Sequence, residues 1–151
     1  CSTVDELTIS EFGIKTLRDL LSQGLTPLTF GDVLVKGGGA YIISGDSLVS
    51  MISNSLGAKK VVFALDVDGI YENRDSSKKL SEKLTKKTKI TNLNSSREDV
   101  TGGISSKLRT GFEIAGHGSD VYFVNGLVPK RVLEALKGRP SVGSYIEAKD
   151  T

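Results

Sequence analysis

Apolar residues follow two patterns along this chain: short unbroken runs and runs at helical spacing. An unbroken run at 61–65 opens with β-branched residues, which predicts a strand buried on both faces of a sheet, and a second strand is expected at 120–124. Apolar residues spaced by three or four predict amphipathic helices at 14–21, 48–56, 104–115 and 129–136. Because strands and helices alternate, the sequence predicts an α/β fold with a mostly parallel open sheet sandwiched by helices, in a single domain over residues 1–151.

Shorter elements are expected between these. Residues 25–30 predict a short strand, and Val33–Val35 and Ala40–Ile43 flank a glycine run at 37–39, which predicts a β-hairpin. The glycines are not followed by Lys-Ser/Thr and a helix, so the hairpin turn is favoured over a phosphate-binding loop. The lysine-rich stretch 72–89 predicts a solvated loop or a short hairpin, or alternatively an electrostatic guide for an anionic ligand.

Composition narrows the class of protein. The 151 residues are 38% hydrophobic and 25% charged, which suits one domain with a sizeable core and excludes a disordered or membrane-spanning chain. The formal charge of +2 is too small to imply nucleic acid, and no apolar run is long enough to cross a bilayer. With one cysteine and one histidine, we expect neither a disulfide framework nor a zinc site, no metal held by the protein alone, and a cytoplasmic location.

Carboxylates follow directly after the apolar run 61–65. Asp66, Asp68 and Gly69 come next in the chain, with Tyr71 two residues further on. Ligands of open α/β sheets bind at the carboxyl ends of the strands, so these residues are candidates for a binding site. The alternative is a strand that ends in a solvated acidic turn.

Two helix starts carry further candidates. Gly45 and Asp46 follow Ser44 at the start of one helix; Asp46 either serves the cap or points into a site that Gly45 lets a ligand approach. Gly102 and Gly103 precede another helix, where exposed backbone N–H groups and the helix dipole favour an anion. Lys107 is expected within the first turn of that helix, where a cation opposes the dipole and a phosphate partner would explain its position.

Together these segments, Ser44-Gly45-Asp46, Leu65 to Tyr71 and Asp99 to Lys107, resemble the amino-acid kinase superfamily. Within it the chain resembles archaeal isopentenyl phosphate kinase most. Gly31-Asp32-Val33 and Asn125-Gly126 also fit the family's pattern, and Leu65 replaces its usual threonine. The resemblance covers nearly the whole chain, in order, and it implies the carboxyl-terminal lobe of the amino-acid kinase fold.

The resemblance implies transfer of a phosphoryl group from ATP, with Mg²⁺, onto isopentenyl phosphate, a phosphorylated isoprenoid. Lys107 would hold the transferring or β-phosphate, and Asp46 would orient the catalytic lysines. Ser44 and Gly45 would border the acceptor phosphate. The nucleotide pocket would be lined by residues from the second and third segments: Asp66, Asp68, Gly69, Tyr71, Gly103 and Lys107.

One departure from the family changes this expectation. The family's early Lys-x-Gly-Gly-Ser strand end and its Gly-Gly-Gly-Ser-x-Gly-His loop do not occur in these 151 residues. We therefore expect the nucleotide-binding part without the acceptor-binding part, inactive alone, and able to self-associate or to pair with the missing half through an open sheet edge. The alternatives are another kinase of the superfamily, such as glutamate 5-kinase or uridylate kinase, and a non-catalytic nucleotide-binding module.

Overall fold

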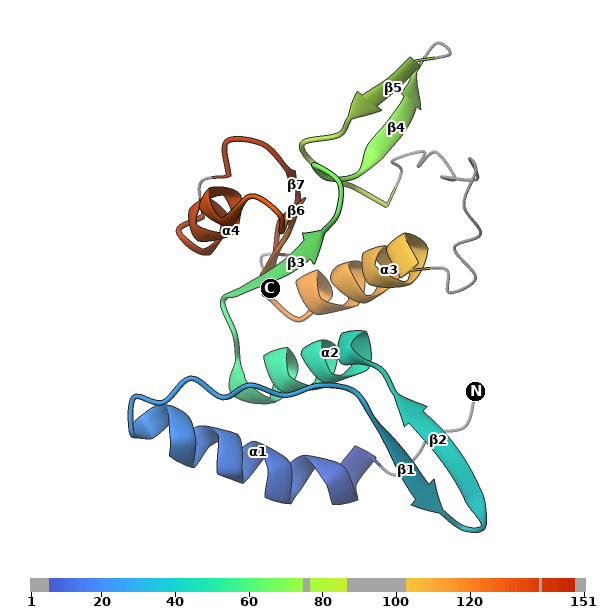
Figure 1. The fold of residues 1–151 in the computed structure, drawn as a ribbon, viewed down its shortest axis with the longest axis vertical. Helices are drawn as coiled ribbons and strands as arrows, with labels where there is room; N and C mark the ends of the chain where they lie inside the picture. Colours follow the sequence, from blue (N-terminus) through green and yellow to red (C-terminus); the bar gives the residue numbers. More distant parts are fainter. Residues whose placement is uncertain (1–5, 75–76, 87–102, 139, 149–151) are drawn as a thin grey trace. The chain divides into compact units, whose positions relative to one another are not determined.

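The computed structural model describes residues 6–74, 77–86, 103–138 and 140–148. The chain divides into two compact units, Cys1–Ala58 and Lys59–Thr151, and each is described by itself. Helices and strands alternate along the chain (Figure 1), so the predicted α/β class is confirmed. Among the described helices, none is both long enough and apolar enough to span a bilayer.

The first unit consists of two helices and a hairpin. Helix α1 (Glu6–Ser22) packs beside α2 (Gly45–Leu56), and the Arg18 guanidinium donates a hydrogen bond to the Ser55 carbonyl oxygen. Strands β1 (Asp32–Lys36) and β2 (Gly39–Ile43) pair antiparallel. The turn residues Gly37 and Gly38 have φ of 59° and 79°, a left-handed conformation that favours glycine, so the predicted glycine hairpin is confirmed.

One predicted strand is wrong. Residues 25–31 form no strand, although 25–30 carry apolar side chains. Pro27 has no backbone N–H to give to a strand ladder, and the side chains of Leu28 and Phe30 are 96% and 80% exposed. Apolar composition alone therefore does not make this segment a strand.

The second unit holds a three-stranded sheet in the order β3-β6-β7. Strands β3 (Lys60–Leu65) and β6 (Asp120–Asn125) are parallel, and β7 (Ser144–Ile146) runs antiparallel to β6. Helices α3 (Gly103–Gly116) and α4 (Pro129–Leu136) pack against it. Strands β4 (Tyr71–Arg74) and β5 (Ser77–Leu80) form a separate antiparallel hairpin. The sheet is thus mixed, with one parallel pair among the described strands.

Strand β6 is buried on both faces of the sheet, whereas β3 is not. Residues 121–124 of β6, the middle strand, are all buried, whereas burial alternates along β3 and Ala64 is exposed. Phe63 stacks on Phe123 with ring centroids 5.2 Å apart, on the face where Gly111 of α3 lies. Tyr122 and Val124 point to the opposite face, where they meet α4. Strand β3, predicted to be buried on both faces, lies at one end of the described sheet. This position explains why burial alternates along β3 but is continuous along β6.

Candidate functional site

The carboxyl ends of β3 and β6 form one edge of the sheet. Leu65, the last residue of β3, lies opposite Asn125, the last residue of β6, and the Gly126 N–H donates to the Leu65 carbonyl oxygen at 2.8 Å. Residues 66–69 continue from this edge as a bend before β4. The structure therefore places the candidate carboxylates Asp66 and Asp68 where ligands of α/β sheets bind.

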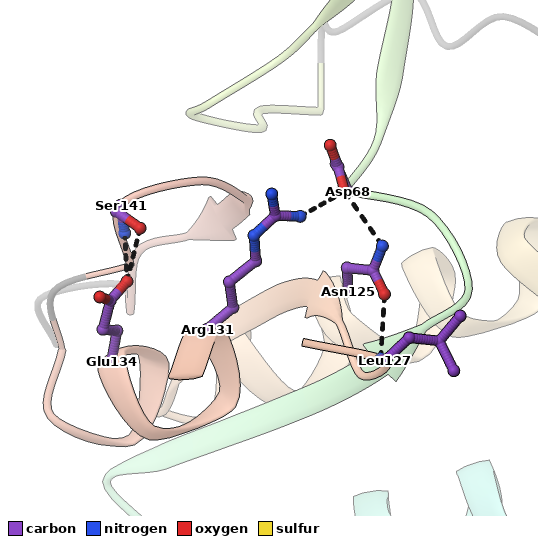
Figure 2. A network of polar contacts seen from close by, with 6 residues as sticks. All are labelled: Asp68, Asn125, Leu127, Arg131, Glu134 and Ser141. Carbon is purple, nitrogen blue, oxygen red and sulfur yellow. Dashed lines mark hydrogen bonds and ion pairs between the residues drawn. The ribbon is translucent and has the colours of Figure 1, made fainter. Parts of the chain in front are cut away.

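Asp68 is held by two side chains from other elements. Its Oδ1 atom accepts a hydrogen bond from the Asn125 side-chain amide at 3.0 Å and pairs with the Arg131 guanidinium on α4. The Asn125 Oδ1 atom in turn accepts from the Leu127 N–H at 2.9 Å, which shapes the turn after β6. Figure 2 shows these side chains converging on Asp68 from two elements. The network ties the loop after β3 to the loop after β6.

These donors change the acidity of Asp68. The hydrogen bond from Asn125 and then the hydrogen bond and charge of Arg131 hold the pKa of the Asp68 carboxyl below its usual range. A similar effect acts on Glu134 of α4, where the Ser141 hydroxyl and N–H lower the pKa of the carboxyl. Asp68 is therefore a carboxylate whose negative charge is stabilised by the fold.

A second attachment holds the same loop two residues later. The Ile70 N–H donates to the buried Ser144 Oγ of β7 at 2.8 Å, and the Ile70 side chain is itself buried. Gly69 lies between the two attachments, and a Cβ atom there would come within 2.7 Å of Ser144 Oγ and 2.9 Å of Leu80 Cδ1. Glycine at 69 is thus required by close packing, whatever its role toward a ligand.

The remaining candidates of this unit lie in different settings. Asp66 is exposed, and Tyr71 is partly buried as the first residue of β4. Gly103 is the first residue of α3, and Lys107, its fifth, is partly buried just beyond the first turn and not within it as predicted, because the helix begins at the second glycine of the pair. The candidate stretch Asp99–Gly102 falls outside the described residues.

The third candidate segment belongs to the first unit. Ser44 is the N-cap of α2, and its Oγ atom accepts from the Ser47 N–H at 3.1 Å. Gly45 is the first residue of the helix and has open space around its Cα, because a Cβ atom added there would meet nothing within 4 Å. Asp46 is partly buried in the first turn, where a negative charge suits the helix dipole.

The lysine-rich stretch begins with a hairpin, formed by β4 (Tyr71–Arg74) and β5 (Ser77–Leu80), and continues through residues 81–86 without a further strand. Strands β4 and β5 pair with Tyr71 opposite Leu80, and the Ser81 N–H donates to the Ile70 carbonyl oxygen at 2.8 Å. Lys83, which follows, pairs with Glu147. The hairpin alternative is therefore confirmed for residues 72–74 and 77–80, while residues 75–76 and 87–102 lie outside the described ranges.

Two residues of the network, Asn125 and Arg131, were not among the candidates from the sequence. A signal for Arg131 was present: it is the third residue of α4, where a cation opposes the helix dipole. The same argument that singled out Lys107 applies to it. Its partner Asp68 lies 63 positions earlier in the chain, so the pairing itself could not be seen in a local pattern.

Metal ligands are sparse in this site. Within the described ranges, no three His, Cys, Asp or Glu side chains are grouped so that they could hold a metal ion. Mg²⁺ is usually bound through one or two carboxylates together with substrate phosphates. Asp66, an exposed carboxylate at the sheet edge, could serve as one such ligand to a Mg²⁺ ion bound with a nucleotide.

Comparison with solved structures defines the class of fold. The isopentenyl phosphate kinase of Thermoplasma acidophilum, solved as a product complex, superposes with a TM-score of 0.67 at 26% identity, covering 88% of this chain and 52% of that one. Carbamate kinase from Giardia lamblia, bound to AMP-PNP, superposes with a TM-score of 0.60 at 14% identity, covering 90% and 49%. Both superpositions confirm the amino-acid kinase fold that the sequence led us to expect.

Sequence comparison identifies the family. The sequence model of the Amino acid kinase family matches residues 2–125, and the chain belongs to this family. Isopentenyl phosphate kinase of Methanothermobacter thermautotrophicus is 29% identical over 148 residues, which cover 93% of this chain and 56% of the relative. Acetylglutamate kinase of Methanocaldococcus jannaschii is 27% identical over 139 residues, covering 90% and 45%. The chain thus spans about half the length of the curated relatives it matches.

Proposed function

We propose that these residues form the nucleotide-binding part of an ATP- and Mg²⁺-dependent kinase that phosphorylates isopentenyl phosphate, and that the acceptor-binding part lies outside them. The observation that carries the proposal is the family membership together with the carboxylates Asp66 and Asp68 at the shared carboxyl edge of β3 and β6. The isopentenyl phosphate acceptor is supported by the names of similar proteins, such as that of Methanothermobacter thermautotrophicus.

The candidate residues at the starts of α2 and α3 have distinct roles in this proposal. ATP would supply the phosphoryl group, and Mg²⁺ would neutralise its charge, so the protein's part is positioning and electrostatic stabilisation. The start of α3 at Gly103 offers backbone N–H groups to phosphate oxygens, and Lys107 adds a positive charge there. In the first unit, Ser44 and Gly45 would border the acceptor phosphate, and Asp46 would orient catalytic lysines.

A second acceptor class is supported by a specific observation. Acetylglutamate kinase and glutamate 5-kinase relatives match 90% and 94% of the chain at 27% and 26% identity, close to the identity of the isopentenyl phosphate kinase. An amino-acid carboxylate would then take the place of the isoprenoid phosphate. Titrating isopentenyl phosphate and acetylglutamate against the NMR amide signals of Ser44 and Gly45, in a longer protein that includes the acceptor-binding part, distinguishes the two, because only the true acceptor should shift them at low concentration.

The nucleotide site is tested at Lys107. We expect Lys107→Ala to weaken ATP binding about tenfold or more, because a charge-assisted hydrogen bond is worth about 1.5–3 kcal/mol and 1.4 kcal/mol is a factor of ten. Arg109→Ala removes an equal charge from an exposed position on the same helix and should change the affinity less than twofold. Calorimetric titration of the chain and both variants with Mg²⁺-ATP measures the effect.

Two results would contradict the proposal. Equal losses in the two variants would mean that ATP responds only to the overall charge of α3, and the assignment of Lys107 would be dropped. Absence of ATP binding by the unaltered chain under conditions where it is folded would reject a nucleotide site in these residues.

A further inference from the structure

The loop 66–70 is attached to the rest of its unit at two separate points. Asp68 is bonded to Asn125 and Arg131, and Ile70 is bonded to Ser144 of β7. The two attachments share no residue, and only Gly69 lies between them. The first controls the part of the loop next to β3, whereas the second holds the part that leads into the β4–β5 hairpin.

The helix α4 itself does not account for an arginine at position 131. It occupies the first turn of α4, where the dipole disfavours a cation, and Val128 at the N-cap makes no side-chain capping bond. Its side chain is only 21% exposed, so it is held against the protein. The contact that accounts for this position is the ion pair with Asp68, which is 40% exposed at the sheet edge.

Asn125 adds direction to this attachment. Its amide nitrogen donates to Asp68 while its amide oxygen accepts from the Leu127 N–H, so the side chain is fixed at both ends (Figure 2). Charge-assisted pairs of this kind fix geometry more strongly than neutral hydrogen bonds do. The loop after β3 is therefore fixed in position relative to the turn after β6, at the sheet edge where a ligand would bind.

We propose that Arg131 and Asn125 are positioning residues of the nucleotide site, which hold Asp68 and so set the direction in which residues 66–68 face a bound nucleotide. This inference rests on the proposed function, and it assigns a new role to Asp68. The carboxylate acts through the loop it anchors, and Asp66 is left as the loop carboxylate that faces outward. The second attachment at Ile70 keeps the hairpin in place if the first is broken.

The test uses Arg131→Gln, which removes the charge and keeps the side-chain stem. Lys130→Gln is the matched control, because Lys130 precedes Arg131 on α4, is exposed and lies 3.9 Å from Glu134, not at Asp68. Arg131→Lys is the conservative variant, which keeps the charge and loses the planar fork. Two quantities are measured for each: the NMR order parameters of the amides of residues 66–72, and the dissociation constant for Mg²⁺-ATP.

In Arg131→Gln we expect the order parameters of residues 66–68 to fall and those of residues 70–72 to stay as in the unaltered chain. The dissociation constant for ATP should rise about three- to tenfold in Arg131→Gln. In Arg131→Lys it should lie between the values of Arg131→Gln and the unaltered chain, and in Lys130→Gln it should stay within twofold of the unaltered chain. If Arg131→Lys recovers part of the ATP affinity and of the order in residues 66–68, the effect of Arg131→Gln comes from the lost pairing with Asp68 and not from a general loss of structure.

Each contrary result has a distinct meaning. Weaker ATP binding with unchanged order parameters would mean that Arg131 contacts the nucleotide directly, which overturns the positioning role. Loosening that spreads equally to residues 70–72 would make the ion pair a general structural contact and would also overturn it. Failure of the unaltered chain to bind ATP rejects the proposed function, while the order parameters, which need no ligand, still decide whether Arg131 orders the loop.

Discussion

Asp68 makes the stability of the second unit depend on pH. Its pKa in the folded chain is lowered, first by Asn125 and then by Arg131, so its contribution is complete above the ordinary carboxyl pKa of about 4 and is lost as the pH falls through the lowered folded pKa. We expect the free energy of unfolding of the unaltered chain to fall more steeply than that of Asp68→Asn as the pH is lowered below about 4. Urea denaturation across this range measures both slopes, and parallel slopes would contradict the expectation.

The sequence located the carboxylates Asp66 and Asp68 but not the partners of Asp68, which are Asn125 and Arg131. Asp66 and Asp68 could be placed at a strand end because the apolar run 61–65 and the residues after it form a local pattern. The sequence could not show that Arg131 pairs with Asp68, since only the pairing of β3 with β6 brings α4 to this edge. The site's local chemistry is thus readable in the sequence, whereas its hydrogen-bond network depends on the tertiary fold.

At the scale of the elements, α3 lies close to the sheet because of Gly111. A Cβ atom at 111 would lie 2.8 Å from Phe123 Cζ, and Phe123 is fully buried and stacked on Phe63. Alanine usually stabilises a helix by about 1 kcal/mol relative to glycine, but overpacking of a core typically costs about 1–3 kcal/mol. The difference between these two effects leads us to expect Gly111→Ala to lower the free energy of unfolding by up to about 2 kcal/mol, as measured by chemical denaturation.

The same helix provides the control for this prediction. A Cβ atom at Gly116, the last residue of α3, would meet nothing within 4 Å. Gly116→Ala should therefore be neutral or slightly stabilising. A Gly111→Ala variant as stable as Gly116→Ala would show that Phe123 can move aside and that α3 is not held at this distance by the glycine.

Element prediction succeeded where short-range rules decide the structure. Two glycines with left-handed φ between Lys36 and Gly39 define a hairpin turn, and Ser44 caps α2 as its side-chain chemistry favours. Prediction failed for residues 25–30, where strand formation needs a partner that apolar composition does not supply. The apolar run in β3 wrongly predicts burial on both faces for a similar reason, because the position of a strand within its sheet depends on the tertiary fold.

At the scale of the whole molecule, the apolar residues of the hairpin in the first unit form one exposed face. Val33 lies opposite Ile42 in the antiparallel pair, and Val35 lies two residues along on the same side. The side chains of Val33, Ile42 and Val35 are 56%, 85% and 75% exposed, respectively. Exposed apolar surface of this kind is typical of interaction sites. The association with a second copy or with the missing half, expected from the sequence, stays a prediction.

The purified 151-residue chain should show no measurable transfer of phosphate from ATP to isopentenyl phosphate. The family's Lys-x-Gly-Gly-Ser strand end and its glycine loop with histidine do not occur in these residues. The loss of one donor of transition-state stabilisation typically costs about 10² to 10³ in rate, and several would be missing together. A coupled assay for ADP release, with acetylglutamate as a second acceptor, measures this, and turnover with either acceptor would contradict the prediction.

The hydrogen bond from Ile70 to Ser144 joins residues 74 positions apart and has a consequence for the order of events during synthesis. The ribosome delivers the loop after β3 long before it delivers β7. Until β7 has emerged and paired with β6, the Ile70 N–H cannot bond to Ser144, and Gly69 lacks its packing contact with Ser144. Non-local contacts of this kind form late, because chain entropy must first be overcome. The nascent chain therefore completes the attachment at Ile70 only after β7 has been made, whereas Asn125 and Arg131, the partners of Asp68, are delivered earlier.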